Sequence, residues 1–415
     1  MVQSYDAVVV GAGVMGAMAA MQLASGGMER VLVVEKGPGV GFGSTGKSNA
    51  IFRQTYSHFE TCLMAHESLR IMLNWADFME LKAPRAAYRD VGVVFLLPKE
   101  DPVVERIMNM HKAVGVKSQL LDFYERKRVM PDVDFCATPL DLDADAHECG
   151  GELAVIYEPD GGFADPVGTT EDVLEVARRL GVEVRFNVRV TAVLQASGRV
   201  MGVEIASGGN SERLHAPVLI NCAGPWAMGL NALAGAPLPQ RIVPIRAQKV
   251  AKRHPERLKK RLPVINDLVN GFNIRPDNTG MQIFLSSFRE KYAHEVVPNP
   301  DEYNDSADPD FREENLVMAH HRVPTFHARG EITSYSGLYT VNLDDNHPVI
   351  DETELWGLYV ACGFSGHGFK LSPVVGMLIA QKVLGQWGRG KTDVPLDFFN
   401  RDRAPLKSFM DGFFS

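Results

Sequence analysis

Glycine-rich segments carry the residue types best suited to hold a phosphate-containing cofactor. The first, Gly11-x-Gly13-x-x-Gly16, lies between a β-branched run at 7–10 and an Ala- and Met-rich stretch, and Glu35 ends the next apolar run. Such glycines permit a tight turn, the approach of a pyrophosphate to the backbone, and close packing of helix on strand. The helix N-terminus offers N–H groups to the anion, and an acid about twenty residues on can bind a ribose. The pattern predicts a dinucleotide site without distinguishing NAD from FAD.

Two later segments favour FAD. Residues 221–226, Asn-Cys-Ala-Gly-Pro-Trp, end a predicted strand with a turn of small residues. Residues 363–370, Gly-Phe-Ser-Gly-His-Gly-Phe-Lys, form a further glycine-rich crossing. A nicotinamide site needs one such turn, whereas an extended flavin cofactor lying across a sheet needs close backbone approach at several places.

The elements that position these turns follow from hydrophobic periodicity. The first forty residues read as strand, turn, helix and strand, a βαβ unit. The polar, turn-rich residues 298–312 predict an exposed loop. Ser372 before Pro373 suits the N-cap and first position of a helix over 373–384. Further helices are predicted at 61–80, 102–114 and 170–180, and further strands at 91–97, 182–186, 188–194, 200–205, 218–220, 242–250, 271–275, 281–285 and 358–361.

Composition limits the class of protein. The 415 residues predict two or three domains, and Lys+Arg 43 against Asp+Glu 51 gives a net charge of −8, which disfavours nucleic acid as a partner. The uncharged stretch 7–28 lacks the basic start and cleavage site of a signal peptide, so we expect no membrane span and a cytoplasmic protein. The cysteines are odd in number, widely spaced and without Cys-x-x-Cys, which favours a reducing compartment over a disulfide framework or zinc site. They are Cys62, Cys136, Cys149, Cys222 and Cys362.

Together these segments resemble the D-amino acid oxidase superfamily of flavoproteins, in the branch of sarcosine oxidases and dehydrogenases and related secondary-amine oxidases. Four stretches carry the resemblance: the N-terminal βαβ unit with Glu35-Lys36, residues 43–56, residues 158–166, and residues 339–370. The octapeptide at 363–370 is the most specific of them, in the form seen in sarcosine oxidases.

The resemblance implies a Rossmann-like FAD-binding domain of the glutathione-reductase type, an α/β domain assembled from residues 1–84, 154–229 and 331–405. Residues 85–153 and 230–330 would form an α+β substrate-binding domain with a mainly antiparallel sheet. The implied contacts to FAD come from all the motif segments: Gly11, Gly13, Gly16, Glu35, Lys36, Ser44, Thr45, Ser48, Val190, Gly224, Trp226, Gly337, Gly363, Ser365, Gly366, Gly368, Phe369 and Lys370.

The resemblance also implies a substrate site. Arg53 and Lys370 match the family's two cationic ligands for a substrate carboxylate, which Arg can bind through two hydrogen bonds while Lys adds a point charge. Tyr339 and His367 would lie near the flavin or the substrate.

Two departures from the family pattern matter. Monomeric sarcosine oxidases carry a cysteine bonded to FAD two residues before the strand tyrosine, where this chain has Gly337, so we expect non-covalent FAD. Those oxidases also place a lysine over the flavin to activate oxygen, and Gln282 aligns there. A neutral residue at that position would slow the reaction with O2, which leaves oxidase and dehydrogenase both open.

The reaction implied is hydride transfer to flavin from a carbon next to a secondary or tertiary amine, followed by imine hydrolysis, with O2 or an electron carrier as acceptor. Sarcosine, dimethylglycine and iminodiacetate are candidate substrates, and a diacid would need a further cation from Arg246, Arg275 or Arg322. Two alternatives stay open: the flavin subunit of a multi-subunit sarcosine-type dehydrogenase, and a non-catalytic flavin-binding assembly factor. Both a homo-oligomer and a hetero-subunit assembly are compatible with the sequence.

Two other groups of residues predict no chemistry. The basic run 249–261 is expected to be a solvated face, because most such runs are. His320, His321 and His327 have no carboxylate or cysteine at ligand spacing nearby, so we expect no metal site.

Overall fold

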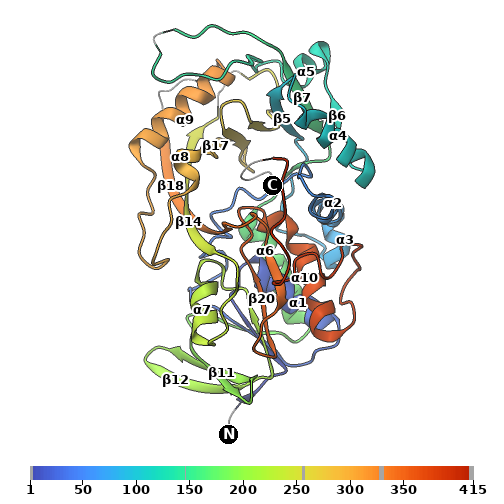
Figure 1. Cartoon of the computed structure of the whole chain (residues 1–415), viewed down its shortest axis with the longest axis vertical. Coiled ribbons are helices and arrows are strands. Elements are labelled where there is room, and N and C mark those ends of the chain that lie inside the picture. Colours follow the sequence, from blue (N-terminus) through green and yellow to red (C-terminus); the bar gives the residue numbers. More distant parts are fainter. Residues whose placement is uncertain (1–2, 145, 255–257, 327–330, 411–415) are drawn as a thin grey trace.

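The computed structural model describes residues 3–144, 146–254, 258–326 and 331–410, so His327 lies outside the described residues. The molecule is elongated, and its two main sheets occupy opposite halves (Figure 1). Strands β11 (Arg199–Ser207) and β12 (Asn210–His215) lie at the N-terminal end, and helix α9 (Pro309–Arg322) lies in the other half.

A six-stranded sheet forms one half, in the order β19-β20-β13-β2-β3-β9. All neighbours are parallel except β19 and β20, as expected for a sheet built from βαβ units. The predicted opening βαβ unit is confirmed as β2, α1 and β3. The bounds are β2 Ala7–Val10, β3 Val31–Val34, β9 Glu183–Arg185, β13 Val218–Asn221, β19 Val349–Glu352 and β20 Leu358–Cys362.

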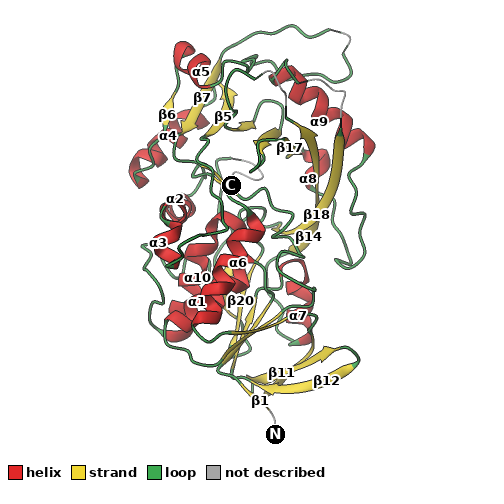
Figure 2. Ribbon diagram, turned by 180° about the vertical axis from the view of Figure 1, so that it is seen from behind, coloured by secondary structure: helices red, strands yellow, loops and turns green. Residues whose placement is uncertain are grey.

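Both faces of this sheet are covered, which explains its apolar strands. Val9 and Val33 pack among helices, whereas Val8 and Leu32 pack against strands of a four-stranded sheet, because side chains alternate along a strand. Figure 2 shows the covering helices α1, α6 and α10 side by side. The bounds are α1 Val14–Ser25, α2 Phe59–Leu73, α3 Trp75–Met79, α6 Pro166–Arg179, α10 Gly368–Leu384, β1 Gln3–Ser4 and β10 Arg189–Ala196.

An eight-stranded sheet forms the other half, in the order β18-β14-β17-β16-β15-β5-β7-β6, and it is mainly antiparallel. A short pair, β4 with β8, stands apart from it. The bounds are β4 Ile51–Phe52, β5 Val93–Pro98, β6 Gln119–Leu120, β7 Leu153–Glu158, β8 Gly162–Phe163, β14 Ile242–Arg253, β15 Val264–Asp267, β16 Phe272–Pro276, β17 Gln282–Ser287 and β18 Ile332–Asn342. The remaining helices are α4 Val103–Val114, α5 Phe123–Val129, α7 Ala227–Leu233, α8 Glu290–Ala293 and the 3-10 turn η1 Gly224–Trp226.

The predicted start of the last helix is wrong. Helix α10 begins at Gly368, with His367 as its N-cap, and Pro373 lies inside it. Proline has no N–H to donate to the carbonyl four residues earlier, that of Phe369. The hydroxyl of Ser372 donates to that carbonyl at 2.9 Å, so the helix continues through the proline. Its N-terminus therefore lies directly at the glycine-rich turn.

The loop predicted at 298–312 is shorter than expected, because α9 begins within it at Pro309, with Asp308 as its N-cap. The division into two domains stays a prediction. The predicted borders at residues 154 and 331 do not follow the sheets, because β7 and β18 pair within the eight-stranded sheet rather than within the six-stranded one.

The expectation that the cysteines form no disulfide is wrong for one pair. Cys136 and Cys149 are bonded, with their Cα atoms 5.5 Å apart. They close an irregular loop that has no recognisable motif, and the N–H of Gly150 donates to the Thr138 hydroxyl at 2.8 Å inside it. Cys62, Cys222 and Cys362 are free and buried. Among the described residues, we find no helix both long and apolar enough to span a membrane.

Candidate active site

One cavity of about 680 Å³ is lined by segments of both main sheets. The glycine turn after β2, the end of β3 and the turn after β13 meet strands β14, β16 and β18 around it. Most of the residues predicted to bind cofactor or substrate line this one cavity: Gly11, Gly13, Glu35, Lys36, Ser44, Thr45, Ser48, Arg53, Val190, Gly224, Trp226, Gly337, Tyr339, Gly366, Gly368, Phe369 and Lys370.

The first glycine turn is shaped by close backbone approach. Gly11 has φ +106, and a Cβ on it would lie 2.5 Å from the Cys222 carbonyl oxygen. A Cβ on Gly16 would lie 1.8 Å from the carbonyl oxygen of Gly11. Gly16 therefore packs the helix on the turn and does not itself line the cavity. Glu35 accepts the backbone N–H of Ala12 at 2.9 Å, which fixes its carboxylate at the cavity wall.

The cavity wall fits a dinucleotide. Helix α1 begins after Gly13, which has no side chain to cap it, so the N–H groups that follow Val14 in the first turn are available to an anion. Ser44 Oγ is shielded from solvent and has no hydrogen-bond partner among the described residues, as expected of a group that forms its hydrogen bond with a ligand. The Thr45 hydroxyl accepts the N–H of Val14 at 3.1 Å and holds this second loop against the helix start.

Lys36 and Trp226, far apart in sequence, meet at the cavity edge. The Lys36 ammonium lies 3.4 Å from the centre of the Trp226 ring, and the indole N–H donates to Asp301 at 3.0 Å. Lys36 is also paired with Asp301. This contact was not predictable from the sequence, because Asp301 belongs to the polar loop before α9.

Arg53 is buried and stacked on a tyrosine. Its guanidinium carbon lies 4.3 Å from the centre of the Tyr56 ring. The Tyr56 hydroxyl lies 3.3 Å from His367 Nδ1, and burial raises the pKa of Tyr56 to about 12. His367 is buried but is not among the cavity-lining residues described, so it supports Arg53 through Tyr56 rather than facing the cavity.

A buried glutamate fixes the irregular segment after β4 that carries Arg53. Glu158 accepts the N–H of Gln54 at 2.8 Å and the hydroxyl of Thr55 at 2.6 Å. Burial lowers the pKa of the Lys370 ammonium well below its ordinary value, Arg53 lowers it further, and Glu158 raises it. The network therefore places Arg53 and Lys370 close together at the cavity, with one carboxylate behind them.

The turn at 363–366 is held by its own polar groups. The N–H of Asn342 donates to the Ser365 hydroxyl at 3.0 Å, and a Cβ on Gly363 would lie 2.9 Å from the Ile242 side chain. Ser365 therefore ties this turn to β18, and the missing side chain of Gly363 lets the turn approach β14, both behind the cavity wall.

Comparisons with known proteins agree with this geometry. The sequence profile of the DAO family, described as FAD dependent oxidoreductase, matches residues 6–382. The chain belongs to this family.

The flavoenzyme is 24% identical to the mitochondrial sarcosine dehydrogenase of Homo sapiens over 94% of its own length, but it spans only 40% of that protein. It is 26% identical to the monomeric sarcosine oxidase of Bacillus sp. strain B-0618, over 97% of each chain. The L-proline dehydrogenase of P. horikoshii has a similar fold, with a TM-score of 0.81 and 22% identity over 97% of this chain and 98% of that one.

The residue aligned with the oxygen-activating lysine, and the three arginines considered as a further cation for a diacid, are not among the described residues that line the main cavity of this flavoenzyme. Gln282 lies at the start of β17 and lines a separate hollow with Arg253 and Asp277; it is absent from the described lining of the main cavity. Its neighbour on β14 is Arg253, so the aligned position lies four residues along these strands from Ser286 and Lys249, which do line the main cavity. The described lining likewise lacks the three arginines proposed as a further cation. Arg246 pairs with Glu295 and Asp308, Arg322 pairs with Asp267, and Arg275 stacks on Phe163.

A different cation lines the cavity. Lys249, expected on a solvated face, is buried on β14, and its ammonium donates to the Lys47 carbonyl. Burial, and then the charge of Arg275, lowers its pKa well below the ordinary lysine value. Asn273 Oδ1, from β16, lies buried with no hydrogen-bond partner among the described residues. Besides Arg53 and Lys370, the cavity thus offers a third basic side chain and an amide that sequence spacing did not single out.

Proposed function

We propose that this flavoenzyme oxidises a secondary or tertiary amino acid, an N-substituted glycine such as sarcosine, dimethylglycine or iminodiacetate. The observation that carries the proposal is a pair of buried cations, Arg53 and Lys370, on the wall of the cavity that fits a dinucleotide. Two basic side chains on one cavity wall favour a carboxylate as ligand, because each can form a charge-assisted hydrogen bond with it.

The chain's own residues would bind and orient the substrate. Arg53 and Lys370 would hold the carboxylate, and the stack of Arg53 on Tyr56 would fix the direction of the guanidinium. FAD, when bound, would supply the two-electron acceptor for the hydride on the carbon next to nitrogen. The amine must lose its proton first, since a protonated nitrogen has no lone pair to form the C=N bond. One water then converts the imine into an amine and a carbonyl compound.

The third basic side chain on the cavity wall, Lys249, favours an acidic substituent on the nitrogen. Lys249 and the unpartnered Asn273 amide oxygen border the same cavity as Arg53 and Lys370. A diacid such as iminodiacetate would have one carboxylate for each cationic region. Further parts of the proposal are non-covalent FAD, supported by Gly337 at the cavity wall, and a cytoplasmic location, where the three buried cysteines would stay free and the Cys136–Cys149 bond would be open to reduction.

Anaerobic bleaching of the flavin tests the proposal. The purified yellow protein is titrated with sarcosine, dimethylglycine, iminodiacetate, glycine, proline and D-alanine, and each reduced sample is then exposed to air. We expect bleaching by an N-substituted glycine. Fast return of the yellow colour would identify an oxidase, and slow return a dehydrogenase that needs an electron carrier. No bleaching by any of these compounds would refute the substrate class.

The same titration with Arg53→Ala tests the carboxylate site. We expect the substrate concentration for half-maximal bleaching to rise a hundredfold or more, since a buried charge contact is worth about 3 kcal/mol. Arg246→Ala is the matched control, because that arginine is paired with Glu295 and Asp308 elsewhere. Unchanged titrations in Arg53→Ala, with normal FAD content, would remove Arg53 from the substrate site.

A further inference from the structure

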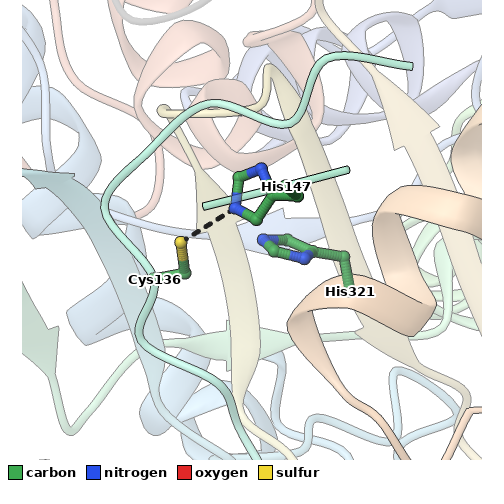
Figure 3. Close-up of side chains that lie close together, drawn as sticks. All are labelled: Cys136, His147 and His321. Atoms are coloured by element: carbon green, nitrogen blue, oxygen red, sulfur yellow. Dashed lines mark hydrogen bonds between the residues drawn. The ribbon is translucent and has the colours of Figure 1, made fainter. Parts of the chain in front are cut away.

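Three potential metal ligands converge in the half of the molecule that holds the eight-stranded sheet, outside the lining of the flavin cavity. Cys136 and His147 come from the loop between α5 and β7, and His321 comes from the last turn of α9 (Figure 3). One ligand atom from each lies within 4.8 Å of the others. The Cys136 sulfur is 3.2 Å from His147 Nε2, and the two imidazole rings have centres 4.7 Å apart.

A fourth ligand is attached to this group. Cys149 is disulfide-bonded to Cys136, so its sulfur lies next to the same point. Around a tetrahedral zinc ion with ordinary bond lengths, sulfur and nitrogen ligands lie roughly 3.3–3.8 Å apart. The three ligand atoms of Cys136, His147 and His321, all within 4.8 Å of one another, have a spacing near this range, and the Cys149 sulfur would complete a Cys2His2 set once its bond to Cys136 is reduced.

The backbone around the cluster is fixed by a buried ion pair. Arg322, the residue after His321, pairs with Asp267 at 2.8 Å, and both side chains are fully buried. The same guanidinium donates to the carbonyls of Asp134 and Cys136 at 2.8 and 2.9 Å. These hydrogen bonds hold the loop that carries Cys136 against the end of α9, and so keep Cys136 close to His321.

One ring nitrogen of His321, Nε2, lacks a hydrogen-bond partner among the described residues and is shielded from solvent. Buried polar atoms without a partner are uncommon, and a bound ion is one of the explanations for them. The neighbouring His320 differs, since its Nδ1 contacts the Phe326 carbonyl at 2.5 Å.

We propose that Cys136, His147, Cys149 and His321 form a zinc-class metal site when the disulfide is reduced. Thiolate and imidazole are the ligands that zinc prefers in closed tetrahedral sites. A small thiol such as glutathione supplies the reducing electrons: two of its molecules become a disulfide, and Cys136 and Cys149 become thiols. Zn²⁺ then displaces one proton from each thiol. Oxidation of the pair removes both sulfur ligands, so the metal and the disulfide exclude each other.

Metal binding by the whole holoenzyme tests the site without reference to its activity. The protein is reduced, freed of reductant and chelator under anaerobic conditions, and titrated with Zn²⁺ against a chromogenic chelator. Co²⁺ is added in a parallel sample, because tetrahedral thiolate Co²⁺ absorbs in the red, beyond oxidised flavin. We expect a single tightly held Zn²⁺ and the tetrahedral Co²⁺ spectrum in the reduced protein, and neither in the disulfide form.

Matched variants separate the site from adventitious binding. His321→Asn and Cys149→Ser are expected to weaken Zn²⁺ binding at least tenfold. His320→Asn, on the adjacent helix position, should bind like the unaltered protein. Equal affinity in His321→Asn and in the unaltered protein, or a Co²⁺ spectrum of octahedral type, would overturn the proposal. Flavin content, read from the same samples, verifies that each variant is folded.

Discussion

At the scale of single residues, His347 has its proton position set by its neighbours. It lies between β18 and β19, buried, with Nδ1 2.8 Å from the Asp345 carbonyl and Nε2 3.1 Å from the Thr61 hydroxyl. A carbonyl only accepts, so Nδ1 carries the hydrogen, and a neutral ring accepts from Thr61 at Nε2. Burial chiefly lowers its pKa from 6.5 to about 4; His58 and Arg403 lower it too, and Asp345 opposes them.

This depressed pKa predicts that the folded state loses stability in acid through His347. Below pH 6.5 His347 is protonated in the unfolded chain, whereas in the folded chain it stays neutral until about pH 4. The free energy of unfolding therefore falls as the pH is lowered from 6.5 to about 4. At pH 5 the contribution is about 2 kcal/mol. Urea unfolding at pH 7.5 and pH 5 should therefore show a smaller acid loss in His347→Asn than in the unaltered protein. The control is His215→Asn, an exposed histidine on β12. Equal losses in all three proteins would contradict the prediction.

At the scale of elements, the first turns of α10 depend on a side-chain hydrogen bond. The Phe369 carbonyl would accept the N–H of residue 373 in a regular helix, but that residue is proline. The Ser372 hydroxyl takes its place at 2.9 Å and is itself buried. Because Gly368, Phe369 and Lys370 line the cavity, this bond also positions cavity residues.

A double-mutant cycle follows from this arrangement. Ser372→Ala should lower the free energy of unfolding by about 1–3 kcal/mol, because it leaves a buried carbonyl without a partner. In a Pro373→Ala background the new N–H serves that carbonyl, so the cost of Ser372→Ala should shrink to a few tenths of a kcal/mol. Urea unfolding of the four proteins measures the coupling. Additive costs would show that the hydroxyl does not replace the missing N–H.

Elements encoded by adjacent residues were predictable, and contacts between distant ones were not. The turn at Gly11, with its strand and helix, follows from a contiguous pattern, and so do the residues recognised in the motif around Arg53. Lys36 and Asp301, 265 residues apart, meet only through packing. Lys249 was predicted to lie on a basic surface because its neighbours in sequence are also basic. Local composition does not show whether a basic side chain on a strand faces solvent or a buried cavity. The Ser372-Pro373 pair predicts a helix start because proline is common at the first position of a helix. The sequence does not show that the Ser372 hydroxyl donates to a carbonyl within the helix and so allows the helix to continue through the proline.

At the scale of the whole molecule, the cavity is shared by both halves. Glu35 and Gly224 border it from the six-stranded sheet, and Lys249 and Asn273 border it from the eight-stranded sheet. A ligand that fills it contacts both, so its binding free energy adds to the stability of the folded chain as a unit.

Removal of FAD should therefore lower the melting temperature of the whole protein in one transition. FAD at one hundred times its dissociation constant contributes about 2.7 kcal/mol, which corresponds to a rise of several degrees over the apoprotein. Gly13→Ala is the matched variant: its Cβ would lie 3.0 Å from Thr45 Oγ1 at the cavity wall, and Gly13 needs no positive φ. We expect the Gly13→Ala apoprotein to melt near the melting temperature of the unaltered apoprotein, and added FAD not to raise it.

Acid precipitation tests whether FAD is bound covalently. Because the proposed binding is non-covalent, the yellow colour should stay in the supernatant, and a yellow pellet would contradict this prediction.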